Sequence, residues 1–178
     1  MAILGVDDFK SKLVGGGARS NLFRVEMGFP GGSGAGAAVS EIGGFLIKAA
    51  QLPASVIAPI TVPFRGRQLQ IAGDRTFEPW TVTVINDTNF ILRDAFEKWM
   101  NYINAHSANT GEVTPGNYFA DASIYQLDKN GDDIKGYTFR GIWPSNVSAI
   151  DVSYDNENAI EEFTVELQVQ YWESGTTS

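Results

Sequence analysis

The residues best suited to chemistry lie in the segment 128–133, DKNGDD, where three carboxylates and an amide oxygen could clamp a calcium ion. An EF-hand loop needs acidic residues at positions 1, 3 and 5, glycine at position 6 and a bidentate glutamate at position 12. Counted from Asp128, Gly131 stands at position 4 and Phe139 at position 12. Because the flanking residues are patterned like strands, we instead predict a hairpin in which Asn130 and Gly131 form a type I′ turn with positive φ. Calcium is not expected to bind.

A second motif, GSGAGA at 32–37, follows a predicted strand and matches the G-x-G-x-x-A dinucleotide fingerprint. The helix that such a motif opens would contain Gly43 and Gly44, which cost about 1 kcal/mol each. The chain also lacks the alternation of strands and helices that dinucleotide-binding folds show. We therefore predict that residues 28–44 are a flexible, glycine-rich connection between strands, with no cofactor.

The remaining titratable residues do not suggest a catalytic set. His106 is the only histidine and cysteine is absent, which excludes thiolate chemistry and a multi-histidine metal site within one chain. His106 follows a predicted helix, where an imidazole complements the helix dipole. The acids of the segment 151–162 fit a solvated rim better than paired glycosidase acids; they are Asp151, Asp155, Glu157, Glu161 and Glu162. We predict no catalytic or metal-binding residues and no enzymatic activity.

The composition indicates an acidic protein of 178 residues, with 13 basic and 21 acidic residues and a net charge of −8. Tight binding of nucleic acid normally needs a basic surface that displaces counterions, so it is not expected here. The first residues lack the apolar region of a signal peptide, and no run of 18 apolar residues occurs, so neither a secretory signal nor a transmembrane segment is predicted.

The hydrophobic pattern predicts a mainly β protein. Strands or extended segments are expected at 22–27, 45–50, 55–64, 67–73, 80–85, 122–128, 134–143, 147–154 and 160–172. One strong helix is expected at 89–105, where Leu92, Phe96 and Trp99 begin an apolar stripe and Asp87 or Thr88 can cap the first turn. This combination predicts an antiparallel β-sandwich or barrel with one flanking α-helix at about 89–105.

Two further features concern surfaces. The strand 160–172 has an apolar face and a polar face, and the polar face must lie against solvent or another polar surface. The polar face consists of Thr164, Glu166, Gln168 and Gln170. In GDRTFEPW (73–80), Arg75 next to aromatic residues is typical of an interface anchor. The same residues are also consistent with an exposed turn that contains a local ion pair between Asp74 and Arg75. Composition does not decide between an interface and a turn.

Four blocks, in this order, resemble the tail tube protein family of contractile-tailed bacteriophages: ARSNLFRVEM (18–27), GDRTFEPWTVTVIND (73–87), GIWPSNV (141–147) and YDNENAIEEFTVELQVQYWE (154–173). The resemblance covers roughly residues 17–173. It implies a flexible N-terminal arm (1–20), one tail-tube domain (21–173) and a short C-terminal tail (174–178). It also implies that six β-barrel-like subunits form a ring and that rings stack into a tube inside a contractile sheath. The haemolysin-coregulated tube protein of type VI secretion is similar in fold.

The resemblance also implies roles for individual residues. Contacts between subunits or rings are expected at Phe64, Arg65, Arg67, Asp74 and Arg75. The polar face at 164–170 becomes a candidate lining of the channel. Core positions are expected at Trp80, Trp143, Phe163 and Tyr171. Trp172 and Glu173 match the end motif of the family without an assignable role.

The partners that the resemblance implies are all parts of a virion that assembles in the host cytoplasm. They are further copies of the chain, the sheath protein, the baseplate and tail terminator proteins, and the tape measure protein in the channel. Double-stranded DNA would pass through later without specific binding, helped by a neutral-to-acidic lumen. No small-molecule substrate is expected. The alternatives are the inner tube of a type VI-like or extracellular contractile injection system and, in another class, a monomeric β-sandwich binding module, with or without calcium.

Overall fold

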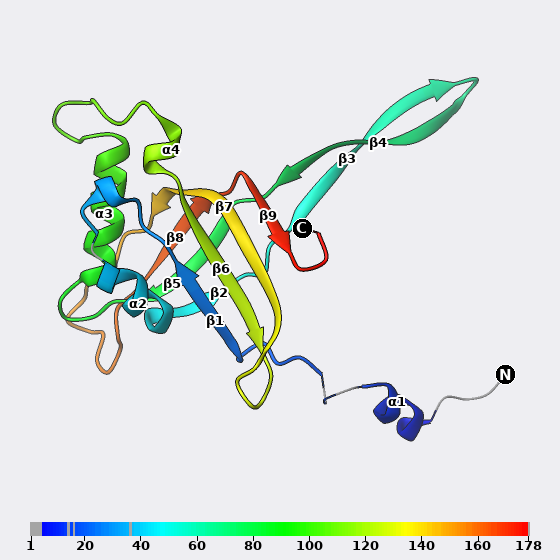
Figure 1. Cartoon of the computed structure of the whole chain (residues 1–178), viewed down its shortest axis with the longest axis horizontal. Helices are drawn as coiled ribbons and strands as arrows, with labels where there is room; N and C mark the ends of the chain where they lie inside the picture. Colours follow the sequence, from blue (N-terminus) through cyan, green and yellow to red (C-terminus); the bar gives the residue numbers. More distant parts are fainter. Residues whose placement is uncertain (1–4, 14, 16, 36, 178) are drawn as a thin grey trace.

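A computed structural model describes residues 5–13, 15, 17–35 and 37–177 (Figure 1). The helices are α1 (Val6–Lys12), the short 3-10 helix η2 (Gly31–Ser33), α2 (Ala37–Leu46), α3 (Ile91–Ile103) and α4 (Pro115–Tyr118). The strands are β1 (Phe23–Met27), β2 (Ile47–Ala50), β3 (Ser55–Phe64), β4 (Arg67–Phe77), β5 (Trp80–Ile85), β6 (Ala120–Leu127), β7 (Asp133–Val147), β8 (Glu162–Gln168) and β9 (Tyr171–Ser174). The predicted mainly β fold with antiparallel pairing is confirmed.

Seven strands form the body, in the order β1-β6-β7-β8-β5-β2, with β9 also paired to β7. The long strand β7 joins the two parts of this sheet, because one stretch of it pairs with β6 and β9 and its last residues pair with β8. In Figure 1, β1, β6 and β7 lie in front of β2, β5 and β8. The body therefore resembles a sandwich whose two halves share β7.

The core lies between these halves and follows the alternation of the strands. In β5 and β8 every second residue is buried, including Val82, Val84, Phe163 and Val165. The ring of Trp80 stacks on that of Phe139 at a centroid distance of 4.2 Å and ties β5 to β7. Predicted core positions Trp80 and Phe163 are thus buried, and Trp143 is partly buried against the same cluster.

Helix α3 closes one end of the core and confirms the predicted helix. Its buried residues Leu92, Phe96 and Trp99 form the expected stripe. The ring of Phe29 lies 5.4 Å from that of Phe96 and 5.5 Å from that of Trp99. The carboxylate of Asp87 accepts the backbone N–H of Ile91 at 3.0 Å, which satisfies one of the free donors of the first turn.

The prediction of a flexible connection at 28–44 was wrong, because this segment contains η2 and most of α2. Helix α2 continues to Leu46, so the extended segment expected from residue 45 starts as β2 at Ile47. The helix packs along β1 so closely that a Cβ at Gly44 would lie 2.9 Å from the carbonyl oxygen of Val25. Glycine therefore weakens the helix but permits this approach, and the helix covers an edge strand of the sheet.

Three strand predictions were wrong in their extent. The expected strand 134–143 extends to Val147 as β7, and residues 148–161, which include all but the first residue of the expected strand 147–154, form a loop. The expected strand 160–172 is interrupted at 169–170, between β8 and β9. There the backbone N–H of Gln170 donates to the carbonyl of Arg140, next to Gly141 with a φ of 61°.

This interruption changes which side chains point inward. Odd-numbered residues are buried in β8, whereas in β9 the exposed residue is Tyr171 and the buried one is Ser174. One extra residue in a strand moves all the side chains that follow it to the opposite face of the sheet. The expected core position Tyr171 is therefore wrong, and Trp172 is half-buried in its place. Gln170 lies outside β8, so of the expected polar face Thr164, Glu166 and Gln168 lie on that strand, on the same side as its first residue, Glu162.

The segment 128–133 closes the hairpin between β6 and β7, but its turn differs from the expected type I′. Gly131 has a φ of 91°, whereas Asn130 is not among the residues with positive φ. The N–H of Gly131 donates to the carbonyl of Asp128 at 3.3 Å, and the N–H of Asp128 donates to the carbonyl of Asp132 at 2.9 Å. This is a type I turn followed by a left-handed glycine, a common three-residue hairpin loop.

The carboxylate of Asp128 closes this loop from within. Its Oδ1 accepts the backbone N–H groups of Asn130 at 2.7 Å and of Asp132 at 3.0 Å. The bond from the N–H of Asp132 has the largest effect, and together these bonds lower the pKa of Asp128 below its ordinary value.

Within the described residues, no helix is long and apolar enough to cross a membrane.

Gly131→Ala should destabilise the unassembled chain by about 1 kcal/mol, because alanine is strained at positive φ even though its Cβ would meet no atom within 4 Å. Urea denaturation followed by circular dichroism measures the change. Gly116→Ala is the matched control, because its Cβ also meets nothing while its φ is ordinary. An unchanged midpoint for Gly131→Ala would contradict the assigned turn.

Candidate functional site: a projecting hairpin

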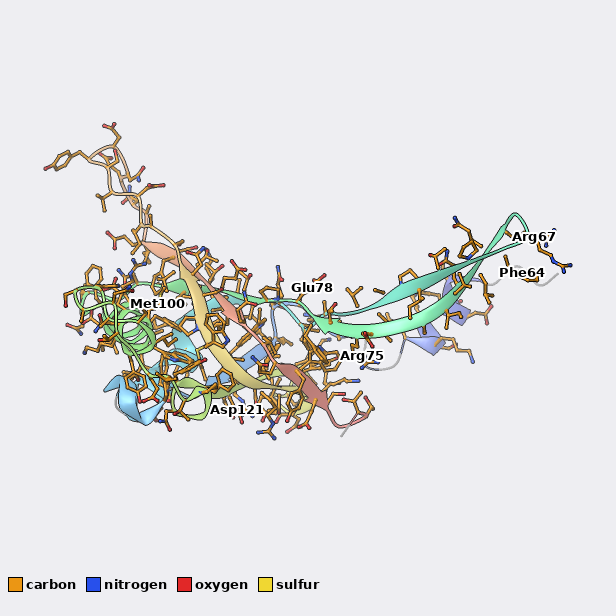
Figure 2. The ribbon with its side chains drawn as sticks, turned by 90° about the horizontal axis from the view of Figure 1, so that it is seen from above. Phe64, Arg67, Arg75, Glu78, Met100 and Asp121 are labelled. Carbon is orange, nitrogen blue, oxygen red and sulfur yellow. The ribbon has the colours of Figure 1, made fainter. Side chains whose placement is uncertain are left out.

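Strands β3 and β4 form a hairpin that leaves the body and pairs only with itself (Figures 1 and 2). Every residue of β3 is exposed, and in β4 only Gly73 and Phe77 are partly covered. A two-stranded ribbon is only marginally stable in water unless another surface packs on it. The hairpin is therefore the part of this chain that most needs a partner.

The outer part of the hairpin has one apolar and one polar face. Cross-strand pairs on the apolar face are Ile60 with Ile71, Val62 with Leu69, and Phe64 with Arg67. The opposite face carries Thr61 with Gln70 and Pro63 with Gln68, and the Thr61 hydroxyl donates to the Gln70 side chain at 2.9 Å. The apolar side chains are open to solvent, with Phe64 at 67% exposure. A continuous exposed apolar face of this kind is typical of an interaction surface.

The tip of the hairpin is a tight turn at Arg65 and Gly66. Their φ angles are 46° and 82°, so both central residues are left-handed, as a two-residue type I′ turn requires. The guanidinium of Arg65 lies over the ring of Phe64 at 5.2 Å. Figure 2 shows Phe64 and Arg67 at the far end of the hairpin. The structure thus gathers three of the expected contact residues, Phe64, Arg65 and Arg67, at the tip.

The other two expected contact residues lie nearer the body, at a bulge. The register runs from Ile57 opposite Arg75 to Pro59 opposite Ala72, so that Gly73 and Asp74 together face Ala58. A bulge of this kind bends and twists a strand pair. Figure 2 shows the curved hairpin with Arg75 on its inner half.

The charged groups of the hairpin have no ionic partners in the single chain. Among the described residues, no ion pair includes Asp74, Arg75, Arg65 or Arg67. The local ion pair between Asp74 and Arg75 considered from the sequence does not form. The hairpin presents three arginines to one carboxylate and is therefore basic on a protein whose net charge is −8.

Two indole rings fix the base of the hairpin. Trp172 Nε1 donates to the carbonyl of Ala54 at 3.1 Å, and its ring meets Phe77 edge to face at a centroid distance of 6.3 Å. Trp80 Nε1 donates to the carbonyl of Gln51 at 2.8 Å. The incoming and outgoing segments are thereby held to the body. The sequence assigned no role to Trp172, since no sequence signal reveals an indole that bonds a carbonyl 118 residues away.

The polar face on β8 lies on the body, apart from the hairpin. Thr164 and Glu166 stand opposite Thr83 and Thr81 of β5, which extends the polar band across two strands. The amide of Gln168 donates to the hydroxyl of Ser145 on β7 at 3.2 Å. The charged residues on this side of β8 are Glu166 and, at the start of the strand, Glu162, which pairs with Lys48.

The acids of 151–162 lie in the loop between β7 and β8 and at the start of β8. Glu161 accepts the side-chain amide of Asn86 at 3.0 Å, and Glu162 pairs with Lys48. All five carboxylate residues, Asp151, Asp155, Glu157, Glu161 and Glu162, are exposed.

Trp172→Phe should loosen the base of the hairpin, because phenylalanine keeps an aromatic ring against Phe77 but cannot donate to Ala54. We expect trypsin to cleave after Arg75 several-fold faster and the free energy of unfolding to fall by about 1 kcal/mol. Tyr171→Phe, on the exposed side of β9, is the matched control and should change neither. Equal cleavage rates for Trp172→Phe and the unaltered chain would exclude this role.

Comparison with known proteins agrees with these features. A family model described as phage tail tube protein matches residues 18–174. The tail tube protein gp19 of Enterobacteria phage T4 is 34% identical over 160 residues, covering 88% of this chain and 91% of that protein. The tail tube protein of Serratia phage KSP90 is 29% identical over 165 residues, covering 92% and 93%.

A solved structure extends the likeness to the fold. A chain in the cryo-EM structure of an extracellular contractile injection system, the PVC sheath–tube complex in its extended state, has a TM-score of 0.59 at 13% identity, covering 93% of this chain and 95% of that one. At this identity the likeness concerns the fold alone. The family match and the phage relatives together show that this chain belongs to the phage tail tube protein family, a family of structural proteins of the bacteriophage tail.

Proposed function

We propose that this chain forms hexameric rings that stack into a tail tube inside a contractile sheath, and that the β3–β4 hairpin makes the contacts between subunits or rings. The observation that carries the proposal is the continuous apolar face of the hairpin, which no residue that the structure describes covers. In this proposal residues 21–173 are the tube domain, 1–20 an arm and 174–178 a tail.

The contact residues in this proposal are Phe64, Arg65, Arg67, Asp74 and Arg75. Phe64 supplies apolar surface at the tip, where it is 67% exposed. The arginines form no ion pair with any of the residues described in the structure, so carboxylates of neighbouring copies can pair with them. Because the rest of the protein is acidic, a basic hairpin favours contact with other copies of the same chain.

Thr164, Glu166, Gln168 and Gln170 are the proposed lining of the channel. The support is the alternation in β8, which turns Thr164, Glu166 and Gln168 away from the core. Gln170 follows in the interruption before β9 and is exposed. A surface of hydroxyl, amide and carboxylate groups offers DNA phosphates no cation to bind. The tape measure protein would occupy the same channel before the genome does.

The remaining partners are the sheath protein outside the tube, the baseplate at one end and the tail terminator at the other. The fold shared with a chain of a sheath–tube complex supports a sheath partner. Assembly would take place in the host cytoplasm and the finished tube would belong to the virion, with no small-molecule substrate and no catalysis. The inner tube of an extracellular contractile injection system is the second candidate, and the 34% identity to a phage protein favours the phage tail.

Leu69→Ser combined with Ile60→Ser should prevent tube formation and leave the body folded, because both residues belong to the apolar face outside the core. We expect the concentration needed for assembly to rise at least about tenfold, since two apolar side chains no longer become buried. Sedimentation velocity and negative-stain microscopy measure it. Thr61→Ser with Gln68→Ser, on the polar face, is the control. Tubes that form equally well with the apolar face altered would exclude the hairpin as the contact.

Glu166→Lys should slow genome ejection at least about threefold, because a ring of lysines would bind DNA phosphates. The measurement is dye-detected DNA release from phage that carry the variant. Glu157→Lys in the exposed loop makes the same charge change elsewhere and should not slow release. Equal release rates for Glu166→Lys and the unaltered phage would show that this face does not meet DNA.

A further inference from the structure

Helix α1 is a second element of the chain that lacks a packing partner. None of its residues is buried, and Figure 1 shows it apart from the body. Val6, Phe9 and Leu13 follow one another at i, i+3 and i+7, which places them on one stripe. Phe9 is 65% exposed. A helix of seven residues does not persist in water by itself, so the apolar stripe needs a surface to cover it.

The apolar face of the hairpin matches this stripe in length. From Val6 to Leu13 a helix rises about 10.5 Å. From Ile60 to Phe64 a strand rises about 13 Å. The three apolar residues of the helix can therefore lie along three successive cross-strand pairs of the hairpin, those of Ile60, Val62 and Phe64. The other exposed apolar residues of the described chain lie on several elements, such as Phe45 in α2, Tyr171 in β9, and Val152 and Ile160 in the loop 148–161. They do not form cross-strand pairs like those of the hairpin.

The charges of the two elements are also complementary. The first turn of α1 carries Asp7 and Asp8, and the tip of the hairpin carries Arg65 and Arg67. The Asp7 side chain is fully exposed, at 3.9 Å from Lys10, and the two arginines have no ion pair among the described residues. With the amino end of α1 toward the tip, opposite charges meet while the apolar stripe covers the apolar face of the hairpin.

We propose that α1 of one copy docks on the apolar face of the β3–β4 hairpin of a second copy, with its acidic amino end toward the arginines of the tip. In Figure 1, α1 and the hairpin leave the body at separate places and do not meet within one chain. In the docked arrangement each copy gives one helix and receives one, so the contact repeats from copy to copy. This inference rests on the proposed self-assembly and adds the element that covers the hairpin.

The absence of cysteine makes disulfide cross-linking a direct test. Phe9→Cys and Leu69→Cys place thiols on the two apolar surfaces. Two single variants mixed and assembled should give a disulfide-linked dimer on a non-reducing gel. The double variant should give chains of several linked copies. The matched control pairs Ser11→Cys with Gln68→Cys, on the opposite faces of helix and hairpin, and should give no dimer.

The outcomes separate this inference from the proposed function. A double variant that cross-links only within one chain would show that α1 covers its own hairpin and would overturn the docking between copies. Absence of the Phe9–Leu69 cross-link, or equal cross-linking of the control pair, would also overturn it. Microscopy of the unaltered chain is the independent readout: if tubes form without the cross-link, the proposed function stands and the docking fails. If no assembly forms at all, both fail.

A substitution gives a second measurement without thiols. Phe9→Ser should raise the concentration needed for assembly at least about tenfold, because the largest apolar group of α1 no longer becomes buried. Ser11→Ala on the outer face of α1 should leave it unchanged. The body of the protein does not contact Phe9, so both variants should fold and show the same melting temperature. Equal assembly by Phe9→Ser and Ser11→Ala would contradict a role for this helix.

Discussion

An apolar sheet face with nothing to cover it is the constraint on which the rest of this structure depends. The hairpin of β3 and β4 carries Ile60, Val62, Phe64, Leu69 and Ile71 in solvent. A soluble monomer gains nothing from such a face, whereas a subunit that buried these side chains against other copies would gain the free energy of their transfer out of water. In the proposed tube, neighbouring copies therefore complete the packing of each subunit.

The body is built so that this hairpin has a defined direction. The interruption at 169–170 exchanges the faces of the last strand and brings Trp172 against the body. There its indole holds the carbonyl of Ala54, and Trp80 holds that of Gln51. Both bonds lie at the base of the hairpin. A small change in the angle between hairpin and body at this point would displace Phe64, at the tip, by a large distance. The bulge at Gly73 and Asp74 then sets the curvature of the outer half.

The sequence could predict those features that depend on local pattern. Alternation placed Phe163 and Val165 in the core, and the stripe of Leu92, Phe96 and Trp99 located α3. It failed where tertiary contacts decide the outcome. Gly43 and Gly44 argued against a helix, but a helix that lies against β1 needs a small residue at Gly44. The inward turn of Trp172 follows the interruption at 169–170, where the N–H of Gln170 donates to the carbonyl of Arg140, and such a contact leaves no periodic signal.

The candidate site was located through family resemblance and not through physical pattern. Composition left Arg75 and its aromatic neighbours undecided between a turn and an interface. The resemblance of residues 59–77 to the family pointed to contact residues between Phe64 and Arg75, and the geometry adds why these side chains are free to make contacts. Arg65 and Arg67 lie on a tight turn at the tip with no ion pair among the described residues.

Hydrogen–deuterium exchange of residues 55–77, compared between the dilute single chain and the assembled protein, tests the central claim most directly. If neighbours complete the packing of the hairpin, its backbone amides exchange fast in the single chain and at least about a hundredfold more slowly in the assembly, while amides of β5 and β8 are protected in both. Equal exchange of 55–77 in the two states, with tubes visible in the same sample, would contradict the account.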